Sequence, residues 1–215
     1  MFDIDLGKYR IVDLSLEVAL GGEPGDPERP FVVERGLLAD RTFKYDVLKT
    51  HTHVGTHVET PAHFYDGGKS ITDLPLDTYM GPAVLAPIDL PRAAVISRQY
   101  LEQLIGDIMR PGRIVVSRDE RKARETGPSP HLDLDSARWL VERGMKMFVL
   151  DIGFGTNVEE GRAIHDIMMG RDIPIVERLA NLEELRKREF SFMALPFKVK
   201  GLDSGWARAI AIEER

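Results

Sequence analysis

The sequence predicts an α/β fold with a mixed sheet, formed by a single domain over residues 1–215. Segments rich in β-branched and aromatic residues, which are typical of strands, alternate along the chain with segments of helical pattern. The chain has 215 residues, of which 43% are hydrophobic and 30% charged, an ordinary composition for a globular domain. It contains no cysteine, which excludes disulfide bonds, thiolate metal sites and cysteine nucleophiles.

The strands are expected where β-branched residues gather between turn-forming residues. Seven such segments are predicted: Ile11 to Leu16, Phe43 to Thr52, Ala83 to Leu90, Arg113 to Val116, Lys146 to Asp151, Phe190 to Leu195 and Ala207 to Ile212.

Capping residues and apolar spacing predict four helices between these strands. The first is capped by Ser97 and runs to about Met109. The second is capped by Asp133 or Asp135, ends at Glu142 and has Gly144 as its C-terminal cap. The third covers roughly Glu159 to Met169, and the fourth covers about Leu179 to Arg188, with apolar residues at Leu179, Leu182 and Leu185.

The charge and hydropathy of the chain limit its partners. A net charge of −6 speaks against a large nucleic-acid surface. No apolar run approaches the roughly 20 residues that a membrane span needs, and residues 1–8 do not resemble a signal peptide. We therefore expect a cytoplasmic protein that binds neither nucleic acid nor membrane.

The histidines are concentrated in one short segment. Four of the six lie between positions 51 and 63, at His51, His53, His57 and His63, and Glu59 lies among them. In a chain without cysteine, imidazole and carboxylate are the ligands suited to zinc, manganese or iron. A cluster of this density predicts a metal site more readily than a set of unrelated surface histidines.

The spacing of these residues requires a bend in the chain. Residues four apart on a flat strand are separated by about 13 Å, too far for His53 and His57 to share one ion. The intervening residues form helices poorly. We therefore predict a break at Gly55-Thr56, since glycine adopts backbone angles that other residues avoid. Glu59, two residues after His57, would then lie on the same side as His57.

The run His-Val-Gly-Thr-His-Val-Glu-Thr-Pro-Ala-His at positions 53–63 resembles the signature of the cyclase-like metal hydrolases, a family that includes bacterial kynurenine formamidases and isatin hydrolase-type enzymes. The resemblance extends over nearly the whole chain, from residues 11–15 and 24–27 through 111–116 to 194–199 and 207–211. It implies a swivelling β/β/α fold, assembled as a homodimer or homotetramer.

The resemblance also implies a role for each site residue. His53, His57 and Glu59 correspond to the first metal ligands, with the acidic residue bridging two ions in members that hold two. His165 and Glu177 would complete the second site, and His63 falls on the catalytic histidine. The cofactor implied is a divalent metal, Zn or Mn, at one or two ions per chain.

Three positions depart from the family pattern. Glu59 stands where aspartate is usual, Arg178 replaces an asparagine that often follows the second-site glutamate, and Pro24-Gly25-Asp26 lacks a preceding tryptophan. The departures at Glu59 and Arg178 keep open a protein that binds metal, or a small ligand through a metal, without turnover. A metal-assisted dehydratase or cyclase is a third possibility, because it could use the same ion and base on a different bond. His63 favours catalysis, since a binding site needs no proton carrier.

The predicted reaction is the hydrolysis of a small amide, formamide or cyclic amide. A metal ion in such a site lowers the pKa of bound water towards about 7. His63, with an ordinary pKa near 6.5, is suited to moving the proton. His51 is expected either to support a ligand or to be structural, and His131 to be structural. Phe64 and Tyr65 could line a substrate pocket or belong to the core.

Overall fold

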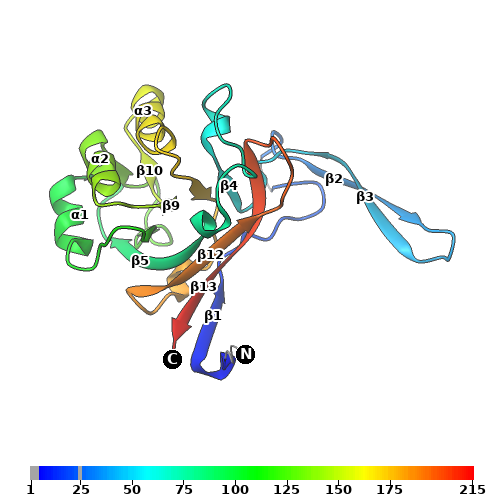
Figure 1. Ribbon diagram of the computed structural model, residues 1–215, viewed down its shortest axis with the longest axis horizontal. Helices are drawn as coiled ribbons and strands as arrows, with labels where there is room; N and C mark the ends of the chain where they lie inside the picture. The colour runs from blue at the N-terminus through cyan, green and yellow to red at the C-terminus, as the bar shows by residue number, and fades with distance from the viewer. Residues whose placement is uncertain (1–4, 24–25) are drawn as a thin grey trace.

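The computed structural model describes residues 5–23 and 26–215 and is built around one closed sheet (Figure 1). Seven of its strands form a ring in the order β13-β12-β5-β7-β9-β11-β4, which closes because β4 also pairs with β13, and β1 extends the sheet from β13. The bounds are β1 (Tyr9–Asp13), β4 (His57–Glu59), β5 (Met80–Ile88), β7 (Ile114–Asp119), β9 (Met147–Val149), β11 (Ile175–Glu177), β12 (Glu189–Pro196) and β13 (Ser204–Glu214).

The sheet is mixed, as the sequence predicts. Strands β5, β7, β9 and β11 are parallel, and β1, β4, β12 and β13 pair antiparallel. Three helices cover the parallel half on one side, namely α1 (Arg98–Ile105), α2 (Leu134–Glu142) and α3 (Val158–Met169). A small parallel sheet accompanies them, made of β6 (Val95–Ile96), β8 (His131–Leu132) and β10 (Gly153–Phe154).

Alternation along the parallel strands creates two hydrophobic cores. In β5, Ala83 and Leu85 point into a core inside the ring, whereas Val84 and Ala86 point into a core between the sheet and the helices. Side chains of a strand alternate between its two faces, and a parallel sheet covered on both faces therefore needs apolar residues at both. This explains the uninterrupted apolar run that predicts the strand.

The helix caps agree with the sequence. Ser97 and Asp133 each accept a hydrogen bond from the backbone N–H three residues later, at the starts of α1 and α2. The third helix begins at Val158, capped by Asn157, and ends at Met169 as predicted. Gly144 has a left-handed φ of 79°, which its capping role requires. The first helix is shorter than expected and ends at Ile105.

The predicted fourth helix, Leu179 to Arg188, is wrong. Only a 3-10 turn, Leu182–Glu184, forms there. Leu179, Leu182 and Leu185 are all buried in the core inside the ring, so their spacing of three reflects an irregular segment lying on that core. Asn181, with a φ of 57°, interrupts any helix before it can propagate.

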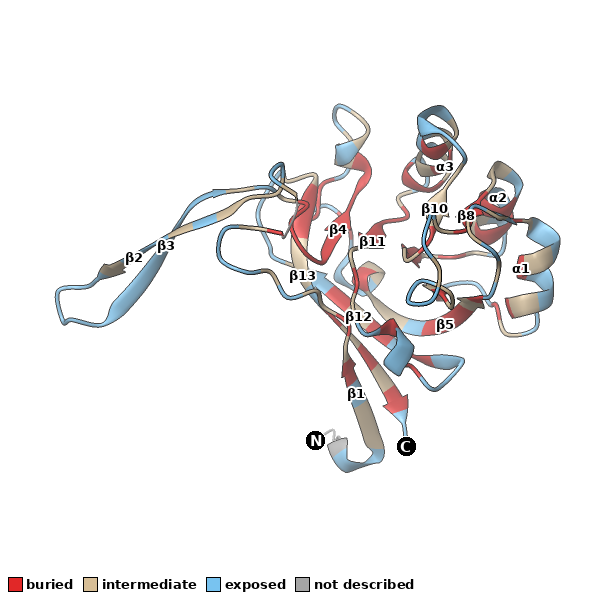
Figure 2. Ribbon diagram, turned by 180° about the vertical axis from the view of Figure 1, so that it is seen from behind, coloured by how far each residue is buried: buried red, intermediate tan, exposed pale blue. Residues whose placement is uncertain are grey.

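A long hairpin projects from the body of the molecule. It consists of β2 (Phe31–Leu37), which the sequence analysis missed, and β3 (Phe43–Thr50). Figure 2 shows that most of it is exposed and that it contacts the body only at its base. The segment that precedes it contains Pro24 and Gly25, which lie outside the described residues.

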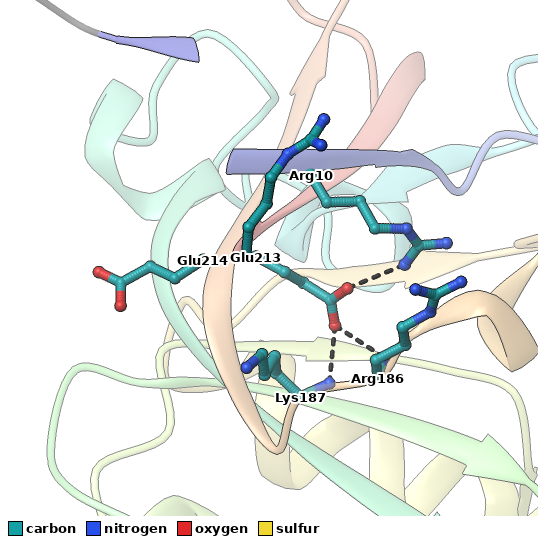
Figure 3. A pocket seen from close by; sticks show the side chains of 6 residues that line it. Arg10, Arg186, Lys187, Glu213 and Glu214 are labelled. Carbon is teal, nitrogen blue, oxygen red and sulfur yellow. Dashed lines mark hydrogen bonds and ion pairs between the residues drawn. The ribbon is translucent and has the colours of Figure 1, made fainter. Parts of the chain in front are cut away.

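A buried carboxylate stabilises the chain near the end of β13, far along this strand from its contact with β4. Glu213 accepts hydrogen bonds from the backbone N–H groups of Arg186 and Lys187 and from the Arg10 side chain (Figure 3). Glu213 and the three residues that donate to it line a cavity of about 670 Å³, and all residues that line this cavity are charged. Burial raises the pKa of Glu213, but these hydrogen bonds outweigh it and hold the pKa below its ordinary value.

We predict that Glu213→Gln lowers the free energy of unfolding by about 1.5–3 kcal/mol at pH 7, because three donors lose a charged acceptor. Urea denaturation measures the change, with Glu214→Gln, at an exposed neighbour, as the control. A carboxyl whose folded pKa is lowered stabilises the protein above its unfolded pKa and loses this effect as the pH falls. The difference should therefore narrow below about pH 4.5; a difference that stays constant to pH 3 contradicts the assignment.

Candidate metal centre and active site

The site is assembled around β4, a strand of only three residues. Its register places His57 opposite Glu177 of β11 on one edge and opposite Trp206 of β13 on the other. Glu59 faces Ile175 and Ser204 in the same way. Because side chains two apart share a face, His57 and Glu59 point to the same side, as predicted. Figure 2 shows β4 as a buried strand between these two neighbours.

The predicted chain break at Gly55-Thr56 is confirmed. Gly55 has a φ of 62°, and a Cβ atom there would lie 2.5 Å from the Val18 side chain. Its N–H donates to the buried Glu23 carboxylate at 2.6 Å. Thr56 fixes the following residue, because its hydroxyl receives the Leu16 N–H and donates to the Arg178 carbonyl. Only glycine satisfies both the backbone angle and the close approach.

The bend brings three predicted ligands together. His53 Nδ1 lies 3.2 Å from His57 Nε2 and 2.8 Å from Glu59 Oε1, and His57 Nε2 lies 3.4 Å from that oxygen. The three side chains are buried. His57 Nδ1 lies 2.8 Å from the Gly55 carbonyl oxygen, which leaves Nε2 facing the group. This support fixes the ring in the manner of a metal-ligating histidine.

A second group shares Glu59. His165 from α3 and Glu177 from the end of β11 bring ligand atoms within 4.8 Å of one another and of Glu59. The ring of His165 is held through Nδ1, which lies 2.8 Å from the Gly161 carbonyl oxygen. Glu177 is the last residue of β11. The five predicted ligands therefore form two adjoining groups that share Glu59.

The electrostatics of this cluster favour a cation. Burial and the neighbouring charge of Glu59 raise the pKa of Glu177 to about 7. Burial also raises the pKa of Glu59, but hydrogen bonds from His53 and His57 outweigh it and lower that pKa. Two carboxylates this close in a buried position repel each other unless a positive charge lies between them. A divalent cation would meet that need.

The residues fit a metal by geometry as well. Two ligand atoms about 2.0–2.1 Å from a tetrahedral ion are separated by roughly 3.4 Å. The separations among His53, His57 and Glu59, from 2.8 to 3.4 Å, come close to this value. The donors are nitrogen and oxygen only, a set that suits a divalent metal ion. The longer side chain of Glu59, compared with aspartate, still reaches both groups.

His63 lies beside these groups and contacts a residue that the sequence analysis missed. Its Nδ1 is 2.8 Å from Asp203 Oδ2, and its ring centroid is 4.4 Å from that of His53. Asp203 is held in place because its carbonyl oxygen accepts hydrogen bonds from the N–H and hydroxyl of Thr60. Since 140 positions separate His63 and Asp203, only the pairing of β4 with β13 brings them together.

Two other histidines surround the site differently. His51 Nδ1 accepts the His53 backbone N–H at 3.1 Å, so it supports the loop that carries a candidate ligand. A third set of possible ligands, His53, His63 and Asp203, adjoins the two groups, and His53 Nε2 lies 3.2 Å from Asp203 Oδ2. His131 lies on β8, is buried, and belongs to none of these three sets within the described residues. The expectation that His131 is structural agrees with this position.

The Arg178 departure has a backbone consequence. Arg178 has a φ of 59°, a left-handed conformation that asparagine tolerates better than most side chains. The guanidinium forms an ion pair with the buried Glu23, which itself accepts the Gly55 N–H. Arg178 thus supports the bend at Gly55 through Glu23, and the Glu23 carboxylate neutralises the charge of Arg178.

Comparison with known proteins adds the family. Residues 12–153 match the model of the Cyclase family, described as "Putative cyclase". The chain belongs to the Cyclase family. Cyclase-like protein 1 of Arabidopsis thaliana is 32% identical over 179 residues, covering 77% of this chain and 68% of that protein. The kynurenine formamidase of Bacillus cereus is 27% identical over 192 residues, covering 87% of this chain and 88% of the enzyme.

Solved structures related to this Cyclase family member share its fold. Isatin hydrolase A from Labrenzia aggregata, bound to benzyl benzoate, superposes with a TM-score of 0.79 at 21% identity, covering 97% of this chain and 95% of that one. A structure described as a potential metal-dependent hydrolase with cyclase activity gives a TM-score of 0.76 at 20% identity, covering 96% and 99%. The β/β/α architecture expected from the sequence is therefore confirmed.

Proposed function

We propose that this protein is a metal-dependent hydrolase that cleaves a small amide, formamide or cyclic amide with metal-activated water. The observation that carries the proposal is the sharing of Glu59 between two candidate metal groups, with the His63–Asp203 pair alongside. The names of two relatives, kynurenine formamidase and isatin hydrolase, support an enzyme acting on C–N bonds other than peptide bonds.

The ligand set divides naturally between two ions. His53, His57 and Glu59 would hold the first, and Glu59, His165 and Glu177 the second. The donor chemistry supports zinc or manganese, at one or two ions per chain. When bound, such an ion supplies Lewis acidity towards a carbonyl and lowers the pKa of water.

His63 carries the proton in this proposal. Its side chain is about one-third exposed, at 34%, so its outer nitrogen is accessible to a substrate. Asp203 accepts a hydrogen bond from the Nδ1–H group, which leaves Nε2 to take a proton from water and then donate it to the leaving nitrogen. Asp203 orients the ring and stabilises its charged form, the role that a carboxylate plays towards a catalytic histidine.

The alternatives make different demands on this pair. A protein that only binds metal or a small ligand has no need of an oriented proton carrier, so the His63–Asp203 contact favours catalysis. A dehydratase or cyclase could use the same groups on another bond. The mass of the product separates such an enzyme from a hydrolase, because only hydrolysis adds water.

No helix of the described chain is long and apolar enough to cross a membrane. A cytoplasmic location stays a prediction.

The exposed hairpin supports a homo-oligomer, a homodimer or homotetramer. Its register places five apolar residues on one face together with Arg35, whose guanidinium lies over the Phe43 ring; the five are Val33, Leu37, Phe43, Tyr45 and Val47. Six apolar residues of the hairpin are at least half exposed: Leu37, Leu38, Phe43, Tyr45, Val47 and Leu48. At about 150–250 Å² per aromatic side chain, the exposed parts of Phe43 and Tyr45 alone present roughly 200 Å², and the four aliphatic side chains add to this area.

This area is a large part of the roughly 800 Å² that each partner buries in a stable interface. A two-stranded ribbon is marginal in water by itself. A second copy offers the same ribbon, so two copies could cover each other's apolar face symmetrically.

We predict that metal-loaded wild-type protein releases formate from an arylformamide and that His63→Ala reduces turnover by roughly 100-fold or more, because the proton has no carrier. Metal content should stay nearly intact, since His53, His57 and Glu59 remain. Mass spectrometry of products and elemental analysis of the protein provide the two measurements.

Glu183→Ala, at an exposed position outside the candidate metal groups, is the control and should retain most activity. Equal loss of metal and turnover in His63→Ala would make His63 a ligand instead. A product of unchanged mass would exclude hydrolysis.

We predict that Phe43→Glu combined with Val47→Glu converts the oligomer to monomers, because two charges would be buried in the apolar face of the hairpin. Light scattering during gel filtration measures the mass. Lys44→Ala, on the opposite face, should leave the assembly intact. A wild-type protein that elutes as a monomer would refute the proposal.

A further inference from the structure

A cavity of about 700 Å³ opens between α3 and the β10 loop and reaches the candidate metal centre. In Figure 1 the helix lies directly beside this loop. Its apolar lining includes Phe64, Ile152, Phe154 and Val158. Val158 is 91% exposed although it lines the cavity, so its side chain presents apolar surface to whatever enters. Pockets of this size and character bind small molecules.

His165, one of the candidate metal ligands, lines this cavity. His165 stacks on Phe64, with ring centroids 4.8 Å apart and planes at 24°, and meets the edge of Phe154 at 4.8 Å. The same imidazole places a ligand atom within 4.8 Å of Glu59 and Glu177. A molecule in the cavity would therefore have one end against the aromatic side chains and the other near the metal centre.

A single cation stands at the edge of this apolar surface. Arg162 precedes His165 by three residues on α3, so the two side chains are neighbours on one face, about 5–6 Å apart at Cβ. Its guanidinium carbon lies 4.3 Å from the Phe64 ring centroid, and Nη2 donates to the Phe64 carbonyl at 3.1 Å. Nε donates to Asp166 Oδ1 at 3.2 Å.

These contacts hold the guanidinium without saturating it. Arginine has five N–H groups, and the described residues offer acceptors to Nε and Nη2 of Arg162 but none to Nη1. Asp166 Oδ1, which accepts the hydrogen bond from Arg162 Nε, also accepts one from the Tyr65 hydroxyl at 2.9 Å. Glu160, two residues before Arg162, accepts hydrogen bonds from the N–H and hydroxyl of Thr156. The Arg162 side chain remains 49% exposed.

We infer that Arg162 determines the specificity of this site by binding an anionic group on the substrate, whose aromatic ring lies in the cavity. The inference rests on the proposed amide hydrolysis at the adjoining centre. An aromatic ring is the group that Phe64 and Phe154 accommodate best. A carboxylate about one ring away from the scissile bond reaches Arg162, whose planar donors match its geometry.

The test compares ligands that differ only in charge. Formanilide and 3-formamidobenzoate share the ring and the scissile bond, and aniline and 3-aminobenzoate are the corresponding products. Binding of the two products to metal-loaded protein is measured by calorimetry, and hydrolysis of the two formamides is measured as kcat/KM. The variants are Arg162→Gln, which removes the charge, and Arg162→Lys, which retains it. Arg98→Gln is the control, because Arg98 forms the same i,i+4 ion pair on α1 with Glu102.

We expect wild-type protein to bind 3-aminobenzoate about 10-fold more tightly than aniline, and the same preference in kcat/KM. Arg162→Gln should abolish the preference while leaving the neutral compounds unaffected; Arg162→Lys should keep part of it, and Arg98→Gln all of it. Absence of a preference, no binding of 3-aminobenzoate at millimolar concentration, or equal losses for both compounds in Arg162→Gln would overturn the inference.

The outcome also separates this inference from the proposed function. Preferential binding of 3-aminobenzoate without hydrolysis of either formamide would retain the anionic pocket and remove the hydrolase. Hydrolysis of both formamides at equal rates, with Arg162→Gln unchanged, would retain the hydrolase and remove the role of Arg162.

Discussion

The double pairing of β4 is the constraint on which the rest of the structure depends. These three residues close the ring by bonding to β11 on one edge and β13 on the other. The same pairing delivers Glu177 and the Asp203 segment to His57 and Glu59. Closure of the sheet and assembly of the site are therefore one event. The repulsion between the buried Glu59 and Glu177 carboxylates is a cost of this arrangement, which a bound cation would offset.

Local rules made much of the site predictable. His53 and His57 can share one ion only if the chain between them bends, and Gly55 is the one glycine between them. The φ of 62° at Gly55 confirms the bend. Helix starts at Ser97 and Asp133 follow from the hydrogen bonds that those side chains make. The position of His165 on a helix follows from apolar periodicity in the same way.

Features set by distant contacts were beyond the sequence. The strands β4 and β11, each three residues long, carry too little pattern to separate them from loops. The leucine spacing after Arg178 looked helical because an irregular segment on a core also buries residues at regular intervals. Asp203 had no neighbouring signal, since its partner His63 lies 140 residues away and meets it only through the closed sheet.

The central claim, that Glu59 joins two metal groups, is tested most directly by elemental analysis of protein purified without chelators. Wild type is compared with Glu59→Ala and, as a control, with Glu183→Ala at an exposed position. We expect one or two zinc or manganese ions per wild-type chain, retention in Glu183→Ala and loss in Glu59→Ala. Wild-type protein without metal, and without uptake on addition of zinc or manganese, would contradict the account, as would full metal loading of Glu59→Ala.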